Sequence, residues 1–393
     1  MNRRPDFAPL HVAMQKAVDD KFLPGLSSAV LIGRDVADLH CTGFADRENG
    51  IALRPDHLFR VFSNTKLATS CAVLQLWEAG RLGLDDPIET YLPALGNRRV
   101  LKRGAERIDD SEPARSSITV RHLMSHSSGL SYGLLDPGTP MFKAYSQRRI
   151  ARATLTLEQM VDALADLPLS FHPGTAWEYS IATDVLARLV EVVSGERFDD
   201  YLRTHVFAPL GMRDTFFVVP EAKRARLTAY YRGFDVMAPL VPGLVRTDEA
   251  PYPGAYLKPM PKLSGGGGLV SSLHDQIALV KSLLPGGPTL LKPDTIALMM
   301  RNQLPDGVTL RFPMGAIPGR GHGLAGGVVM HPLPTDSRHA GGEFYWGGIA
   351  GTQWWIAPRH NLAGLIMTQR QMAFFHPALG ALKRTVYDCV LGQ

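Results

Sequence analysis

Cysteine is scarce in this chain, and its few cysteines form no pattern that binds a metal or builds a disulfide framework. There are three, Cys41, Cys71 and Cys389, and none belongs to a Cys-x-x-Cys pair. An odd, widely spaced set argues against both a disulfide scaffold and a zinc site. We therefore expect a fold that needs neither disulfides nor metal, in a reducing compartment such as the cytoplasm.

Long apolar segments are also missing. No run approaches the roughly 18 to 20 apolar residues that span a bilayer. The first 25 residues, MNRRPDFAPLHVAMQKAVDDKFLPG, lack the continuous apolar core and the small-residue cleavage site of a signal peptide. We expect a soluble, cytoplasmic protein that does not act at a membrane.

A strong excess of one charge is absent as well. The net charge is +5, but the 42 basic residues are dispersed among 37 acidic ones. Even the basic cluster QRRIAR at 147–152 is more typical of a solvated helix face than of a nucleic-acid site. We therefore expect no nucleic-acid partner.

Apolar periodicity predicts a mixture of helices and strands. The chain is 45% apolar and no linker divides it, so it can bury a sizeable core. Expected helices lie within 7–21, 65–76, 121–125, 157–165, 184–193 and 377–391. Expected strands are a hairpin at a sheet edge, 28–32 with 37–42, and runs at 343–346, 353–357 and 364–368.

The distribution of these elements predicts two lobes. A sheet lobe is expected from 1–83 together with 255–393, and a mostly helical lobe from 84–254, with the active site at their interface. The four glycines at 265–268 predict a close backbone approach followed by a helix.

One segment joins a serine to a lysine at helical spacing. Ser63-Asn64-Thr65-Lys66 is the single Ser-x-x-Lys of the chain, at the start of the helix expected over 65–76. On a helix the lysine returns to the serine's face, so its ammonium can reach the hydroxyl. The N–H groups at a helix N-terminus can stabilise a developing oxyanion. About one such match arises by chance in a chain this long, so companion elements decide.

Companion elements are present in variant form. Tyr179-Ser180 lies in an expected loop, 171–180, and Trp346-Gly347-Gly348 follows a strand-like run. Together with Ser63-x-x-Lys66 these elements resemble the family VIII carboxylesterases, relatives of class C β-lactamases and penicillin-binding proteins. Further matches are 120–130 (VRHLMSHSSGL), 209–215 (PLGMRDT) and 266–272 (GGGLVSS), so the resemblance covers nearly the whole chain.

The resemblance implies a fold and a set of roles. The fold is the α+β penicillin-recognising fold, an antiparallel sheet flanked by helices with a mostly helical lobe. Ser63 is then the nucleophile, and Lys66 and Tyr179 are the proton-transfer pair. The N–H groups of Ser63 and Ile349 would form the oxyanion hole. No metal or organic cofactor is implied.

Two departures from the lactamase pattern indicate the substrate. Class C enzymes have Tyr-x-Asn where this chain has Tyr179-Ser180-Ile181, and Lys-Thr-Gly where it has Trp346-Gly347-Gly348. The amide and the cation that hold a β-lactam are thus missing. We assign Ile181, Trp346, Gly347 and Gly348 to substrate binding and expect short-chain esters. A β-lactamase or D-alanyl-D-alanine peptidase, an acyltransferase at the same site, and an inactive binding module are the alternatives.

Competing signals are weaker. Gly129-Leu130-Ser131-Tyr132-Gly133 matches the Gly-x-Ser-x-Gly elbow of α/β-hydrolases, but its neighbours do not predict the strand and helix that the elbow requires. His122 and His126 have metal-ligand spacing without the glutamate of His-Glu-x-x-His, which favours a structural role. Trp354 and Trp355 should alternate across a strand, one packed and one facing the cleft or solvent.

Overall fold

The two ends of the chain build one antiparallel sheet. The computed structural model describes residues 5–133, 138–235, 238, 240–248, 251–313 and 315–392. The sheet has eight strands, in spatial order β12 (Arg320–His322), β13 (Gly327–Val329), β14 (Phe344–Gly347), β15 (Gln353–Ala357), β16 (Leu362–Met367), β1 (Gly25–Ile32), β2 (Asp35–Asp46) and β3 (Ile51–Ala52). All neighbouring pairs are antiparallel. The α+β class expected from the sequence is confirmed.

The expected hairpin does not lie at an edge as a whole. Strand β1 pairs with β2 on one side and with β16 on the other, with Ser27 opposite Met367 and Ile32 opposite Leu362. The edge interpretation was wrong for β1 because its second partner comes from the far end of the chain. Local apolar alternation contains no information about such a partner.

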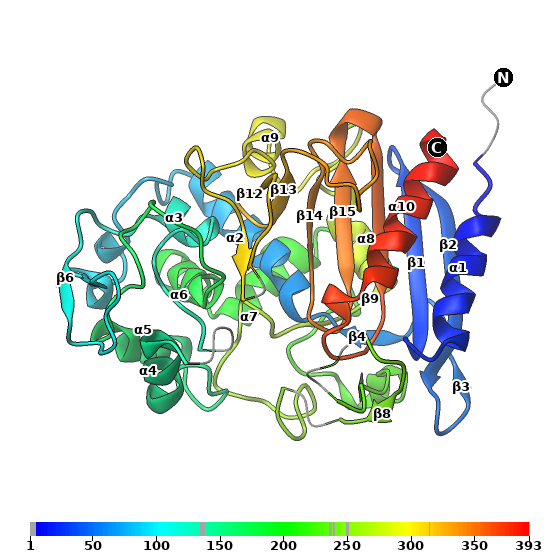
Figure 1. Ribbon diagram of the computed structural model, residues 1–393, viewed down its shortest axis with the longest axis horizontal. Coiled ribbons are helices and arrows are strands. Elements are labelled where there is room, and N and C mark those ends of the chain that lie inside the picture. The colour runs from blue at the N-terminus through cyan, green and yellow to red at the C-terminus, as the bar shows by residue number, and fades with distance from the viewer. Residues whose placement is uncertain are drawn as a thin grey trace.

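Both faces of the sheet are covered. Leu26, Trp355 and Ile366 pack under the terminal helices α1 (Ala8–Asp19) and α10 (Pro377–Leu391), which lie side by side in Figure 1. Trp354 and Leu365 point into the main core on the other face. Both tryptophans are therefore 1% exposed, and the expectation that one faces the cleft or solvent was wrong. Burial on two faces follows from helix layers on both sides.

The main core extends from the sheet through α2 (Thr65–Glu78) to the helical part of the molecule, at the left of Figure 1. The other helices are α3 (Val120–Met124), α4 (Pro140–Arg148), α5 (Leu157–Ala165), α6 (Ala182–Ser194), α7 (Phe198–Tyr201), α8 (Leu273–Lys281) and α9 (Pro293–Met299), with a π-helical turn η4 (Leu202–Phe207) after α7. One continuous cluster joins both parts, and the lobe boundaries expected at 84 and 254 stay a prediction.

Short elements complete the fold. The paired strands are β4 (Leu58–Arg60) with β9 (Val270–Ser272), β5 (Arg99–Leu101) with β6 (Ser111–Pro113), β7 (Tyr231–Arg232) with β8 (Val245–Arg246), and β10 (Arg311–Phe312) with β11 (Gly315–Ala316). The 3-10 turns are η1 (Phe62–Asn64), η2 (Ile88–Thr90), η3 (Pro93–Leu95), η5 (Glu221–Arg226), η6 (Pro358–His360) and η7 (Ala373–Phe375). Within the described ranges, no helix has both the length and the apolarity to cross a membrane.

Candidate active site

Ser63 is placed by a sharp turn between a strand and a helix. Strand β4 ends at Arg60, and the 3-10 turn η1 runs directly into α2. Phe62 adopts a left-handed φ of 45°, a conformation that costs energy for a side chain of this size and recurs at functional sites. The turn is held because Thr352 Oγ1 donates to the Val61 carbonyl and the Leu269 N–H donates to Thr65 Oγ1. Ser63 thus stands at the N-terminal end of a buried helix.

Three side chains that were predicted to act together lie within reach of one another. The Ser63 Oγ and the Tyr179 hydroxyl are 2.6 Å apart, and the Lys66 ammonium lies 3.5 Å from the Ser63 Oγ. The same ammonium donates to the Gly266 carbonyl at 2.6 Å and lies 4.8 Å from the centre of the Tyr179 ring. Lys66 is only 2% exposed. A hydroxyl beside a phenol and an ammonium has the neighbours that a serine nucleophile needs.

Aromatic rings hold Tyr179 in place. Its ring stacks on Tyr132, with centroids 5.6 Å apart and planes 2° apart, and it contacts His126 at 5.0 Å and Trp346 at 5.6 Å. The next residue, Ser180, donates its N–H to His126 Nδ1. The phenol is therefore fixed from its faces and through the backbone that follows it.

Two histidines near this cluster, His126 and His322, are buried. His126 is 2% exposed, and burial, with His322 and Lys66 nearby, holds its pKa well below the usual value. Burial also lowers the pKa of His322 to about 4, and Lys66 adds to the effect. Both rings are therefore uncharged at neutral pH. His122 closes the capping box of α3 with Thr119, and the described residues hold no cluster suited to a metal ion.

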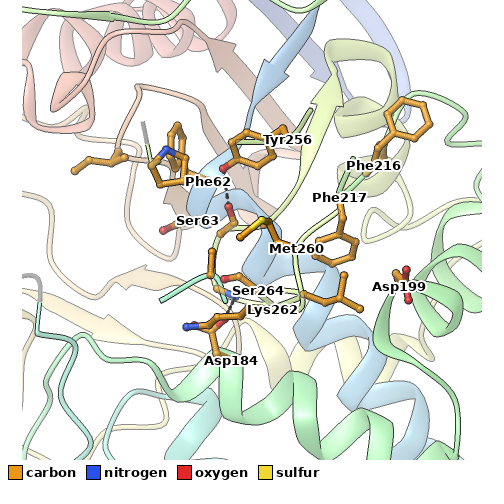
Figure 2. A pocket seen from close by; sticks show the side chains of 18 of the residues that line it. Phe62, Ser63, Asp184, Asp199, Phe216, Phe217, Tyr256, Met260, Lys262 and Ser264 are labelled. Atoms are coloured by element: carbon orange, nitrogen blue, oxygen red, sulfur yellow. Dashed lines mark hydrogen bonds between the residues drawn. The ribbon is translucent and has the colours of Figure 1, made fainter. Parts of the chain in front are cut away.

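A large cavity opens in front of Ser63. Its volume is about 1470 Å³, and Figure 2 shows part of its wall. Aromatic and sulfur-containing side chains form much of the lining, among them Phe62, Tyr132, Tyr179, Met212, Phe216, Phe217, Tyr256, Met260, Phe312, Trp346 and Phe374. Such a wall suits an apolar ligand.

Most of the predicted site residues line this cavity, namely Ser63, Tyr179, Ile181, Trp346, Gly347 and Ile349. Lys66 lies behind Ser63, on the buried side of α2. Gly348 is packed so tightly that a Cβ there would lie 2.4 Å from the Val61 carbonyl and 2.5 Å from Thr352 Oγ1. Gly348 therefore packs against the backbone of Val61 in the turn that follows β14.

Ser131, the serine of the competing Gly-x-Ser-x-Gly motif, makes backbone hydrogen bonds that fix its loop. Its N–H donates to the Tyr145 hydroxyl, its carbonyl accepts the Ile181 N–H, and it is 5% exposed. A helix and a turn precede it where the elbow requires a strand, and residues 134–137 lie outside the described part of the chain. The strand and the helix of a nucleophile elbow are not found next to Ser131 among the described residues.

Sequence reasoning missed two residues next to Lys66, namely Gly266 and Asp184. Gly266 accepts the lysine's hydrogen bond, and Asp184, 2% exposed at the start of α6, accepts the Gly266 N–H at 3.4 Å. The available signal was the run of four glycines, which predicted a close backbone approach without naming its partners.

Comparison with known proteins identifies relatives along almost the whole chain. Residues 12–384 match the family described as Beta-lactamase. The chain is 31% identical over 394 residues to esterase EstB of Burkholderia gladioli. The alignment covers 97% of this chain and 95% of EstB. Two solved structures are also similar, each over 97% of both chains. EstCE1, "a hydrolase with promiscuous acyltransferase activity", has a TM-score of 0.79 at 27% identity. Simvastatin synthase LovD from Aspergillus terreus has a TM-score of 0.81 at 25% identity.

Proposed function

The chain belongs to the Beta-lactamase family, and from this premise we propose that it hydrolyses carboxylic esters through an acyl-enzyme formed on Ser63. It is a serine hydrolase of the esterase type, as its relatives indicate. The observation that carries the assignment of Ser63 is its 2.6 Å contact with the Tyr179 hydroxyl, with Lys66 at 3.5 Å.

Acylation uses each of these groups. The Ser63 Oγ attacks the ester carbonyl carbon and gives its proton to the Tyr179 and Lys66 pair. The N–H groups of Ser63 and Ile349 stabilise the oxyanion of the tetrahedral intermediate. When the intermediate collapses, the bond to the alcohol oxygen breaks and the pair returns the proton to that oxygen. The alcohol leaves and the acyl group stays on Ser63.

Deacylation repeats the sequence with water. Water attacks the acyl carbonyl, the pair takes its proton and returns it to Ser63 Oγ, and the acid leaves. No redox step or metal enters this sequence, because every bond change is an acyl or proton transfer.

The lining of the cavity favours neutral esters. Trp346 is 3% exposed and Ile181 is 1% exposed, and both line the cavity where a lactamase has a cation and an amide. A substrate carboxylate at this position would lose water without gaining a partner, which costs several kcal/mol. Turnover of β-lactams or of D-alanyl peptides is the alternative, and the assay below tests β-lactam turnover directly.

Acyl transfer is a second candidate, favoured by the size of the cavity. A volume of about 1470 Å³ exceeds the roughly 300 to 1,000 Å³ of a typical ligand site, which leaves room for an acceptor alcohol beside the acyl-enzyme. EstCE1 is described as a hydrolase with promiscuous acyltransferase activity, and LovD is described as a synthase. Ester formation in the presence of an added alcohol, measured against hydrolysis of the same donor, separates the two outcomes.

The expected location rests on the cysteines. Cys41, Cys71 and Cys389 are free thiols, and burial raises the pKa of Cys71 to about 12. Free thiols fit the cytoplasm expected from the sequence, and this location stays part of the proposal.

The decisive experiment compares wild type with Ser63→Ala on p-nitrophenyl esters and a chromogenic cephalosporin. We expect ester turnover that is lost in the variant, and an acyl adduct on the peptide that contains Ser63. Ester turnover that survives in Ser63→Ala would refute the assignment of the nucleophile. Cephalosporin turnover equal to ester turnover would instead support a lactamase.

A further inference from the structure

The Lys66 ammonium is held in place by a backbone carbonyl, and that backbone is itself held by a buried acid. Lys66 Nζ donates to the Gly266 carbonyl at 2.6 Å, a shorter contact than its 3.5 Å approach to the Ser63 Oγ. The N–H of the same glycine donates to Asp184 Oδ1 at 3.4 Å. Gly266 therefore connects the acid to the lysine through a single residue.

The glycine run is clamped between two helices. From α2, Thr69 Oγ1 donates to the Gly265 carbonyl at 2.8 Å. On the side of α6, a Cβ on Gly265 would lie 2.7 Å from the Thr183 carbonyl and 2.8 Å from the Ala187 Cβ. The segment therefore packs closely against both helices at Gly265, next to the glycine whose carbonyl accepts from Lys66.

The surroundings of Gly266 show how close the Asp184 carboxylate and the Lys66 ammonium are to each other. A Cβ built there would lie 2.9 Å from Asp184 Oδ2 and 3.2 Å from Lys66 Nζ. Both charged groups thus lie close to the same point beside Gly266, although the ion pairs of the described residues include no direct bridge between them.

Asp184 lies at the start of a helix and near a second lysine. It lies in the first turn of α6, where the helix dipole stabilises a negative charge. Lys262, on the cavity wall, lies near it, as Figure 2 shows. Burial lowers the pKa of Lys262 while Asp184 opposes that shift, so the two charges attract each other. The other titratable groups that face this cluster are Tyr132, Tyr179, His126 and His322.

We propose that Asp184 is a positioning residue for the esterase reaction, acting on Lys66 through Gly266. This inference rests on the proposed function of Ser63, Lys66 and Tyr179. The acid orients the Gly266 peptide that holds the ammonium, and it places a carboxylate close to that ammonium. Tyr179 lies two residues before Ile181, the N-cap of α6, and Asp184 lies within the first turn of that helix.

Removal of a negative charge makes deprotonation of nearby groups more favourable. The rising limb of kcat against pH should therefore move to lower pH in variants that lose the charge, whereas a purely structural role would leave it in place.

The test uses Asp184→Asn, which keeps an acceptor oxygen and loses the charge, and Asp184→Ala, which loses both. Asp162→Asn, at an exposed site on α5, is the control with the same change in net charge. Each protein is assayed with p-nitrophenyl butyrate across the pH range, with its melting temperature and its rate of labelling by a fluorophosphonate. We expect kcat to fall at least tenfold in Asp184→Ala with KM changed less than threefold, a smaller fall in Asp184→Asn, and the shifted rising limb in both.

The outcomes are distinct. If Asp184→Asn and Asp184→Ala keep kcat within threefold of wild type, or lose activity with an unmoved pH profile in proportion to lost folded protein, the proposal is wrong. An equal shift in Asp162→Asn would show a general charge effect and would also overturn it. If the proposed esterase function itself were wrong, wild type would lack ester turnover that depends on Ser63. That result is distinct from every outcome above.

Discussion

At the scale of single residues, the Tyr179 hydroxyl is the group whose loss is most informative. It lies 2.6 Å from the Ser63 Oγ, and its ring is held by Tyr132 and His126. Removal of one oxygen leaves that packing intact. The effect on the reaction is thereby separated from the effect on the fold.

We predict that Tyr179→Phe lowers kcat by about 10² to 10⁴-fold, the usual contribution of general acid–base catalysis. The melting temperature should stay close to that of wild type because the ring contacts remain. Steady-state kinetics with p-nitrophenyl butyrate measure the effect. Activity within threefold of wild type would remove the phenol from the proposed mechanism.

The two candidate serines are separated by labelling. A fluorophosphonate should react with Ser63, which has Tyr179 and Lys66 beside its hydroxyl, and not with Ser131. Peptide mapping after labelling identifies the modified residue. Ser131→Ala should keep most of the activity, and label on the peptide that contains Ser131 would contradict the assignment.

At the scale of elements, the site depends on how closely α2 and α6 approach the glycine run. This approach leaves Gly265 without space for a side chain, because Thr183 and Ala187 of α6 are in contact with it. A methyl group there must displace α6, which begins three residues after Tyr179.

Gly265→Ala should therefore destabilise the fold by about 1 to 3 kcal/mol, the usual cost of overpacking, and should reduce kcat as well. The matched control is Gly380→Ala in α10, where a Cβ would meet nothing within 4 Å. That change should be neutral or stabilising by roughly 0.5 to 1 kcal/mol. Chemical denaturation of both variants checks the difference, and equal effects at the two sites would contradict the packing argument.

At the scale of the whole molecule, buried histidines link folding to pH. Burial lowers the pKa of His322 to about 4 in the folded protein, against about 6.5 in an unfolded chain. The unfolded state thus binds more protons between these values. The contribution of His322 to the free energy of unfolding is therefore fully present above about pH 6.5, and it is lost as the pH falls towards 4.

The expected loss attributable to His322 between pH 7 and pH 5 is about 2 kcal/mol. His322→Gln should show a smaller loss over the same interval, measured as the free energy of unfolding in urea at each pH. His126 changes stability in the same direction, so the variant keeps part of the dependence. An identical pH dependence in wild type and variant would show that His322 is not involved.

Substrate choice is also a property of the whole cavity. With Trp346 and Ile181 in its wall, kcat/KM for short acyl p-nitrophenyl esters should exceed that for penicillins and cephalosporins by orders of magnitude. Trp346→Lys should move the ratio towards substrates with a carboxylate. Equal efficiency on benzylpenicillin and on a butyrate ester would show that the missing cation does not decide specificity.

Local patterns in the sequence determined a substantial part of this protein. The helices at 157–165 and 377–391 and the strand at 353–357 were predicted with the bounds that the structure has. Apolar periodicity and helix-start signals act over a few residues, so they are visible without the fold. The spacing of Ser63 and Lys66 singled out that pair, and the family resemblance added Tyr179.

The tertiary structure alone decided how distant segments meet. It paired β16 with β1 across the chain, buried both Trp354 and Trp355, and brought Asp184 to Gly266 behind Lys66. These contacts join residues tens to hundreds of positions apart. The sequence alone does not distinguish a buried acid from an exposed one. What a side chain touches depends on which elements pack together, and that is settled by burial of the whole apolar surface.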